Sequence, residues 1–485
     1  MLIRGGKAAL PGAETPVRVD IRIEGERIAL IAPELSPLPG EEVVDAAGLL
    51  ILPGAIDPHV HFDTPGFTAR EDFLHGSAEA ARGGVTTVVD MPCTSLPPVV
   101  SAAALESKLK AVAPMALIDY GFYGGVRGDI ASAAGNGITA PDRIEKSMTE
   151  LAPRVLAFKA YLLSGMDTFP QVSHEDLGRA ITKAAELGRP LCLHAEDADY
   201  VGAARRRVEA TRNIAGPGKE KASWDDYVDS RPEAAETVAV AAAIALARGH
   251  ERTLHIVHVG TAEAVEALAA AGAGCETCSH YLAFSRDDFA SKGAFLKTAP
   301  PVKARGQAEK LWAMLADGRI SFVTSDHAPA RGEEKRTGSV WTDYGGIPGV
   351  GTTLPYLFSE GYLAGRLTLG RFLDATSGAA ARRYGLASRK GSLEVGKDAD
   401  FVLIDQDGRT VISGAGLYSK GKDTPFDGMK LRGSIKSTWV RGRKVYDAEA
   451  AFGAMKARGA GAEYPEMKGI VADAGYGRFL TWGYA

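Results

Sequence analysis

The chain has 485 residues, which is more than a single domain of ordinary size requires. Hydrophobic residues make up 45% of it and charged residues 24%, as in most globular proteins. The formal net charge of −4 provides no basic surface for a polyanion, so we expect no nucleic-acid partner. Four cysteines are too few for a disulfide framework in a chain of this length.

The distribution of apolar residues predicts neither a leader nor a membrane span. The first residues lack an apolar core behind a basic start, and no apolar run approaches the roughly 18 residues that a span needs. We therefore expect a cytoplasmic protein without a membrane partner. Cys275 and Cys278 have the CxxC spacing, but they lie in an apolar run, which favours two buried strand residues over a redox or zinc site.

The two ends of the chain share a β-like texture. Residues 1–52 alternate in short runs separated by Gly, Pro and Glu, without a helical period, and the same texture returns after residue 390. This predicts one small β-sandwich domain formed by residues 1–52 together with residues 390–445. Residues 446–485 are rich in Gly and Ala, and we expect them to form a C-terminal extension over the surface.

Residues 53–389 alternate strand-like runs with Ala-rich helical stretches. Eight such repeats predict parallel βα units closed into a (β/α)8 barrel, the TIM barrel, which is an α/β fold. An open doubly wound sheet shares this pattern and is the alternative. The predicted strands are 55–61, 85–92, 116–124, 155–161, 190–195, 253–259, 273–280 and 320–325, and the helices include 71–82, 174–187, 234–248, 262–270 and 306–316.

Metal-ligating side chains stand at the ends of four of these strands. His59 and His61 are two residues apart in the first strand, so their rings point to the same face. His194, His258 and Asp326 end the fifth, sixth and eighth strands. Barrel active sites are assembled from the carboxyl ends of several strands. The sequence therefore predicts a metal site built from these five residues.

A lysine and three further histidines are harder to assign. Lys159 lies inside the apolar fourth strand, where a buried ammonium is costly, so it is either functional or a rim residue whose charge reaches water. His255 faces away from His258 by strand parity, which indicates a structural role. For His280 and His327 near the mouth, contact with the ligands and simple packing are both open.

These residues resemble the cyclic amidohydrolases, the group of dihydroorotases, allantoinases, hydantoinases and dihydropyrimidinases. The likeness covers nearly the whole chain, and the matching segments are 53–61, 83–92, 158–159, 193–196, 255–258, 276–282, 324–329 and 396–400.

The resemblance implies two divalent metal ions, usually zinc, bridged by Lys159 after its carboxylation by carbon dioxide. His59, His61 and Asp326 would hold one ion, and His194 and His258 the other. A metal-bridging hydroxide would attack the amide, with Asp326 as both ligand and catalytic acid–base.

Members of this group differ in the residues that hold the substrate. Dihydroorotases carry Arg and Asn where this chain has Asp63 and Cys93, and Asp63 would repel the carboxylate of dihydroorotate. Hydantoinases and dihydropyrimidinases carry a Tyr where this chain has Ser164, and Asn-Gly where it has Gly345 and another glycine. These four residues, with Ser279 of the seventh-strand motif, are the expected substrate contacts.

Several stretches are most similar to allantoinases, namely 91–98, 121–125, 164–170, 345–349 and 424–429. Segments 63–66 and 68–72 depart from them, and Asp63 would favour a different, donor-rich ring.

The expected activity is therefore allantoinase-like, opening allantoin to allantoate. The alternative is a hydantoinase, dihydropyrimidinase or other cyclic amide or imide hydrolase. A non-catalytic homologue is a remote alternative because all six ligands are present. The resemblance also implies a homotetramer or homodimer.

Overall fold

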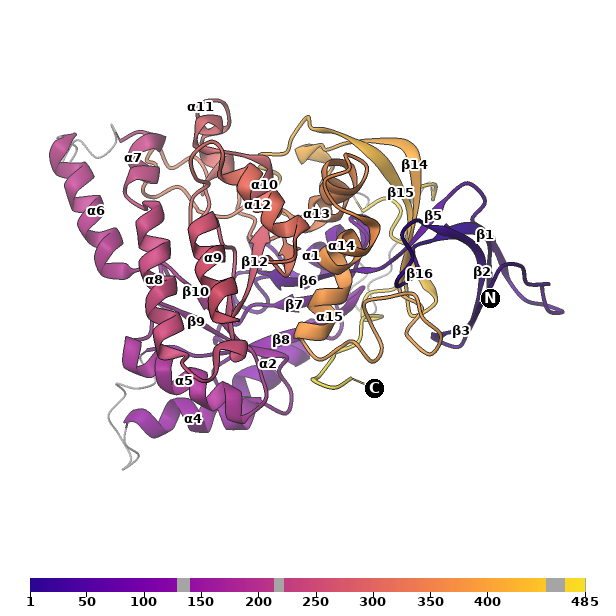
Figure 1. The fold of residues 1–485 in the computed structure, drawn as a ribbon, viewed down its shortest axis with the longest axis horizontal. Helices are drawn as coiled ribbons and strands as arrows, with labels where there is room; N and C mark the ends of the chain where they lie inside the picture. Colours follow the sequence, from indigo (N-terminus) through magenta and orange to yellow (C-terminus); the bar gives the residue numbers. More distant parts are fainter. Residues whose placement is uncertain (129–139, 213–221, 451–466, 485) are drawn as a thin grey trace.

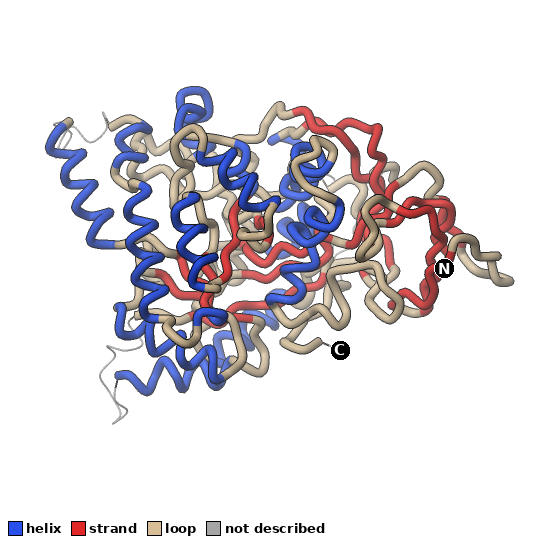
Figure 2. The backbone as a smooth tube through the Cα atoms, in the orientation of Figure 1, coloured by secondary structure: helices blue, strands red, loops and turns tan. Residues whose placement is uncertain are grey.

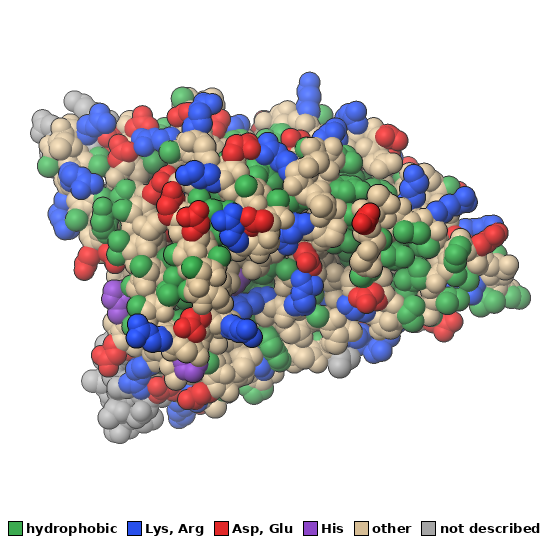
Figure 3. Space-filling model, viewed as in Figure 1, with side chains coloured by type: hydrophobic (Ala, Val, Ile, Leu, Met, Phe, Trp, Pro, Cys, Tyr) green, Lys and Arg blue, Asp and Glu red, His purple; other side chains and the backbone are tan. Residues whose placement is uncertain are grey.

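The structure is a computed structural model that describes residues 1–128, 140–212, 222–450 and 467–484. Helices surround a central set of strands, and a β-rich domain that contains the N-terminus lies at one end (Figure 1). Strands are confined to the barrel centre and to this second domain, as the tube drawing shows (Figure 2). Lys, Arg, Asp and Glu side chains are intermixed over the visible face (Figure 3). No described helix is both long and apolar enough to cross a membrane.

Eight parallel strands form the barrel, each paired with its neighbour in chain order. The first and last strands meet as well, because Val60 forms a parallel bridge with His327 and the His61 N–H donates to the His327 carbonyl at 2.8 Å. The predicted closed barrel is therefore confirmed. The strands are β6 (Ala55–Val60), β7 (Val85–Asp90), β8 (Asp119–Gly125), β9 (Ala157–Tyr161), β10 (Leu191–His194), β11 (Leu254–Ile256), β12 (Gly274–Cys278) and β13 (Phe322–Thr324).

Helices follow the strands and cover the outside of the barrel (Figure 1). The first of them begins two residues later than predicted, because the Asp72 carboxylate caps it by accepting from the His75 N–H at 2.9 Å. The helices are α1 (Phe73–Arg82), α2 (Ala102–Val112), α4 (Ala140–Leu151), α5 (His174–Glu186), α6 (Ala198–Thr211), α7 (Trp224–Asp229), α8 (Glu233–Leu246), α9 (Ala262–Ala271), α10 (Ser279–Ala283), α11 (Phe289–Lys292), α12 (Gln307–Ala316), α13 (Val350–Tyr356), α14 (Leu369–Leu373) and α15 (Ala379–Arg383).

The barrel interior is packed. Its apolar cluster includes Ile56, Val89, Tyr123, Cys192, Val257 and Phe322. A filled interior leaves the carboxyl ends of the strands as the place where a site can form. Cys275 and Cys278 are both free thiols buried in β12, which agrees with the interpretation of the CxxC pair as strand residues.

Both chain ends contribute to the second domain, as predicted. The antiparallel pairing of β5 with β14 joins them, and the strands of the expected sandwich are hydrogen-bonded as one continuous mixed sheet. Its first strand escaped prediction because Gly5, with φ at 78°, interrupts the alternation at a register shift. The strands are β1 (Leu2–Ala8), β2 (Val17–Glu24), β3 (Arg27–Ala32), β4 (Val43–Asp45), β5 (Leu50–Pro53), β14 (Phe401–Val411), β15 (Lys430–Val440) and β16 (Arg443–Asp447).

A buried charge network ties this sheet to the barrel. The Lys390 ammonium lies 2.5 Å from the Asp119 carboxylate of β8, 2.7 Å from Asp400 and 3.0 Å from Asp398. The expected C-terminal extension lies partly outside the described residues, at 451–466. Its later part runs along β8, where the Leu480 N–H donates to the Tyr120 carbonyl at 2.7 Å and the Leu480 side chain joins the apolar cluster inside the barrel.

Candidate metal centre

The barrel brings all six expected ligands to its mouth. His59 lies in β6, His61 follows that strand directly, Lys159 lies in β9 and His194 ends β10. Parity within the strands therefore places these four as the sequence predicted.

His258 and Asp326 differ from their predicted positions at strand ends. Strands β11 and β13 stop at Ile256 and Thr324, so both residues lie two positions beyond pairing. Their backbones are left-handed, with φ at 41° and 47°, a conformation that side chains other than glycine rarely adopt. Such strain persists only where the surrounding structure enforces it, and it concentrates at functional sites.

The candidate ligand atoms lie close together at the mouth of the barrel. Asp326 Oδ1 lies 3.1 Å from His59 Nε2 and 3.3 Å from His61 Nε2, and His194 Nδ1 lies 3.0 Å from His258 Nε2. Ligand atoms of His59, His258 and Asp326 all lie within 4.8 Å of one another. Imidazole nitrogens and carboxylate oxygens so close together, with little water around them, form a donor set suited to divalent transition metals.

In two of these imidazole rings, the nitrogen that faces away from the other candidate ligands is hydrogen-bonded to a buried glutamate. Glu276 Oε1 lies 2.7 Å from His59 Nδ1, and Glu196 Oε2 lies 3.0 Å from His194 Nε2. Glu276 also contacts His255 at 3.1 Å, which gives that histidine a structural role. Although burial opposes it, the bonds from His255 and His59 bring the pKa of Glu276 down to about 2. Each carboxylate thereby fixes the tautomer that leaves the opposite nitrogen free to bind a metal.

We predict that Glu276→Gln weakens divalent-metal binding by about ten- to a hundred-fold, because the amide holds the His59 ring less firmly than a carboxylate does. Titration of the metal-free protein with a competing chelator measures the change. Glu79→Gln is the matched control, since Glu79 is equally buried but pairs with Arg82 instead of a histidine. Equal metal affinity in Glu276→Gln and the parent protein would contradict the orienting role.

Lys159 is the unusual member of the group. The residue is 0% exposed, so the alternative of a rim lysine whose charge reaches water does not fit. Its Nζ has no hydrogen-bond partner among the described residues and lies 4.8 Å from the centre of the Tyr161 ring. Burial lowers the pKa of this amine. A buried amine without a partner among the described residues, near the imidazoles of His59, His194 and His258, fits a position that carries a further group in the working protein.

The other two histidines at the mouth have different environments. His327 Nε2 lies 3.2 Å from Glu71 Oε2, and its Nδ1 accepts from the Gly349 N–H. His327 therefore links the point where the first and last strands meet to the loop before α13. His280 is fully buried, neither of its ring nitrogens has a partner among the described residues, and burial lowers its pKa to about 4. His327 thus supports the fold, and His280 is a neutral packed ring.

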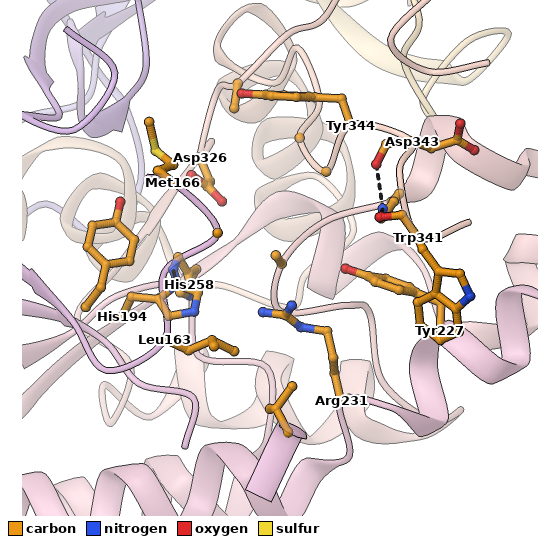
Figure 4. Close-up of a pocket in the computed structure, with 18 of the residues that line it drawn as sticks. Leu163, Met166, His194, Tyr227, Arg231, His258, Asp326, Trp341, Asp343 and Tyr344 are labelled. Atoms are coloured by element: carbon orange, nitrogen blue, oxygen red, sulfur yellow. Dashed lines mark hydrogen bonds between the residues drawn. The ribbon is translucent and has the colours of Figure 1, made fainter. Parts of the chain in front are cut away.

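A cavity of about 420 Å³ opens above the candidate metal ligands and is lined by His59, His61, His194, His258 and Asp326. This volume is in the range of small-molecule sites. His194, His258 and Asp326 lie on one side of the cavity, Tyr227 and Trp341 on the other, and the Arg231 guanidinium reaches between them (Figure 4). The pocket therefore has a candidate metal-binding end and a distal end with aromatic and cationic groups.

The expected substrate contacts are distributed unevenly. Gly345 lines the cavity, whereas Asp63, Cys93 and Ser279 are not among the described residues that line it. Cys93 Sγ lies 3.1 Å from the Tyr161 hydroxyl, and Ser279 Oγ lies 3.1 Å from Thr353 Oγ1. Asp63 has a left-handed backbone with φ at 52°.

Ser164 lies in the loop after β9. It is half-buried, and its hydroxyl accepts from the Met166 N–H at 3.1 Å. Its side chain is thus engaged in shaping the loop that carries Met166, a residue that lines the cavity.

Sequence reasoning missed most of the distal cavity. Tyr161 shares the face of Lys159 by strand parity, so its position was accessible from the pattern. Arg231, Lys297, Trp341 and Tyr344 also line the cavity, but they come from loops. Loops carry no periodic signal, and no pattern in the chain marked these four residues.

Comparison with known proteins agrees with this geometry. The model of the amidohydrolase family matches residues 50–445. An allantoinase of Rubrobacter xylanophilus is 36% identical over 455 residues, which cover 92% of this chain and 94% of the relative. A dihydroorotase of Halobacterium salinarum is 38% identical over 432 residues, or 89% of this chain and 94% of the relative.

Among solved structures, an L-hydantoinase (dihydropyrimidinase) from Arthrobacter aurescens superimposes with a TM-score of 0.86 at 28% identity, covering 99% of both chains. Fold and site together define a TIM-barrel protein with a candidate metal centre at the strand ends. The chain belongs to the amidohydrolase family.

Proposed function

We propose that the protein hydrolyses a C–N bond in the ring of a cyclic amide or ureide, with allantoin as the first candidate substrate and allantoate as the product. The convergence of six ligand residues, five of them buried and Asp326 partly exposed, below a small-molecule cavity carries this proposal. Curated relatives named allantoinase, at 32–36% identity over at least 92% of this chain, support the choice of substrate. A cytoplasmic location and assembly into a homodimer or homotetramer belong to the same proposal.

The residues fit two divalent metal ions, with zinc as the first candidate. His59, His61 and Asp326 would hold one ion and His194 and His258 the other, with carboxylated Lys159 between them. When bound, two such ions lower the pKa of a water that they share and polarise the carbonyl to be attacked.

Lys159 is suited to carboxylation by its surroundings. An uncharged amine adds to carbon dioxide and loses one proton to give an anionic carbamate. Because burial lowers the pKa of Lys159, the amine is uncharged over a wider pH range than an exposed lysine. The resulting anion would sit among imidazoles, which removes the cost of a buried, unpartnered ammonium.

Asp326 is the residue that moves the proton. Both histidine contacts are made to Oδ1, which leaves Oδ2 for proton transfer. Burial opposes ionisation, but His59 and His61 hold the pKa of Asp326 well below its usual range, so the carboxylate starts as a base. It takes a proton from the attacking water and delivers it to the ring nitrogen as the C–N bond breaks.

A hydantoinase or dihydropyrimidinase activity is the second candidate, because the L-hydantoinase structure matches the whole chain with a TM-score of 0.86. A panel of allantoin, hydantoin, dihydrouracil, dihydroorotate and a simple cyclic imide, offered to metal-loaded protein, distinguishes the candidates. We expect the highest kcat/KM for allantoin. Negligible turnover of allantoin beside another ring would reject the first candidate, and less than one equivalent of bound metal would favour a non-catalytic homologue.

A further inference from the structure

The distal end of the cavity contains a buried cation without a carboxylate partner. Lys297 lines the cavity and is 5% exposed. Its ammonium donates to the backbone carbonyls of Asp343 at 2.5 Å and Trp341 at 3.4 Å, and lies 4.8 Å from the centre of the Tyr227 ring. Among the described residues, no carboxylate lies within ion-pair distance of it. An ammonium has three N–H donors, so one donor remains for another acceptor.

The neighbouring charges do not neutralise Lys297. The Asp343 carboxylate points away from the cavity (Figure 4), where it accepts from the Thr337 N–H at 2.8 Å and from the Thr337 hydroxyl. Arg231 is paired with Glu196, and Arg205 with Glu209 at 3.1 Å. Burial lowers the pKa of Lys297 to about 8, so at neutral pH the side chain is still mostly cationic. A cation held out of water in this way is stabilised when an oxygen acceptor binds beside it.

We propose that Lys297 is a specificity-determining residue that binds an oxygen acceptor, a carboxylate or a carbamoyl group, on the exocyclic arm of the substrate. The inference rests on the proposed function, because the ring itself must occupy the metal-binding end. The arm then extends toward Tyr227 and Trp341, which lie on the side opposite His194 and His258 (Figure 4). A ring with an apolar arm would leave the Lys297 donor without a partner and would bind more weakly.

A purely structural role for Lys297 is the rival explanation. The lysine joins the segment that follows α11 to the segment containing Trp341 and Asp343. Lys335 makes the same kind of link, since its buried ammonium donates to the Ala294 and Gly346 carbonyls. Lys335 is not among the cavity-lining residues, although Gly346 is. The two lysines therefore differ in access to the substrate while sharing their effect on the loops.

The test uses metal-loaded full-length protein and three hydantoins whose arm at C5 is carboxymethyl, ureido or ethyl. Calorimetric titration gives Kd for the compounds whose ring is not opened, KM compares the compounds whose ring is opened, and turnover is measured separately. We expect the carboxymethyl and ureido compounds to bind about ten- to a hundred-fold more tightly than the ethyl compound. In Lys297→Met this preference should disappear, with the larger loss for the carboxylate, whereas Lys297→Arg should retain it.

Lys335→Met is the matched control and should change the affinity for all three compounds by the same factor. The inference is overturned if the parent protein binds the ethyl compound as tightly as the others. It is equally overturned if Lys297→Met and Lys335→Met have the same effect on all three. The proposed function fails separately, when the parent protein binds these rings and opens none of the rings in the substrate panel.

Discussion

Replacing Lys159 with alanine is expected to remove activity, with kcat/KM lower by about a thousand-fold or more, equivalent to about 4 kcal/mol. The substitution deletes the proposed anionic bridge and leaves a void among the imidazoles of the site. Metal content should fall together with activity, as measured by elemental analysis of the purified variant. Short carboxylic acids should restore part of the activity, since they can occupy the void and supply the missing anion.

Lys108→Ala is the control for the loss of a buried lysine. Lys108 is also 0% exposed, but its ammonium is paired with Asp90. This variant should lose stability, because Asp90 is left buried and unpaired, and carboxylic acids should not restore any activity that it loses. Full activity in Lys159→Ala would refute the bridging role, whatever the outcome for the control.

The second large effect is expected for Asp326→Asn. Asparagine keeps the shape and one ligand oxygen of the aspartate, but its amide cannot accept a proton near neutral pH. We expect kcat to fall by about a hundred- to ten-thousand-fold, the usual contribution of general acid–base catalysis. Bound metal should be retained better than in Lys159→Ala. Measuring kcat and metal content on the same preparation separates the two effects.

Asp343→Asn serves as the comparison for Asp326→Asn. Asp343 also lines the cavity, and its carboxylate is occupied by Thr337, a contact that an amide oxygen can keep. This variant should retain most of its kcat. If Asp326→Asn lost its metal as completely as Lys159→Ala, or kept full activity, proton transfer by Asp326 would be contradicted.

The barrel was predictable because its signal is local. Strand and helix periods repeat over a few residues, and each of the eight repeats has its own pattern of buried positions. His59 and His61 could be placed on one face from the same pattern, since side chains alternate regularly along a strand, whereas Lys159 stayed open between a functional and a rim residue. The resemblance to a known group then supplied a role for the lysine that strand parity could not.

Residues outside regular pairing were less predictable. His258 and Asp326 were expected at the mouth of the barrel and line the cavity there, but their left-handed backbones beyond the ends of β11 and β13 have no signal in a strand pattern. The orientation of the rings depends on Glu276 and Glu196. Glu276 meets His59 across 217 positions of sequence, a contact that closure of the barrel creates.

The sequence by itself determined the barrel and the joining of both chain ends in one β-domain, and it indicated the six candidate metal ligands. Only the tertiary structure decided which histidine nitrogens face the other candidate ligands and which residues line the distal end of the cavity. Asp63, Cys93 and Ser279 were expected from the resemblance and are not among the described residues that line the cavity, whereas Lys297 and Arg231 are. The reason is physical: periodicity reports which face a residue shares with its near neighbours, whereas a pocket is assembled from loops far apart in the chain.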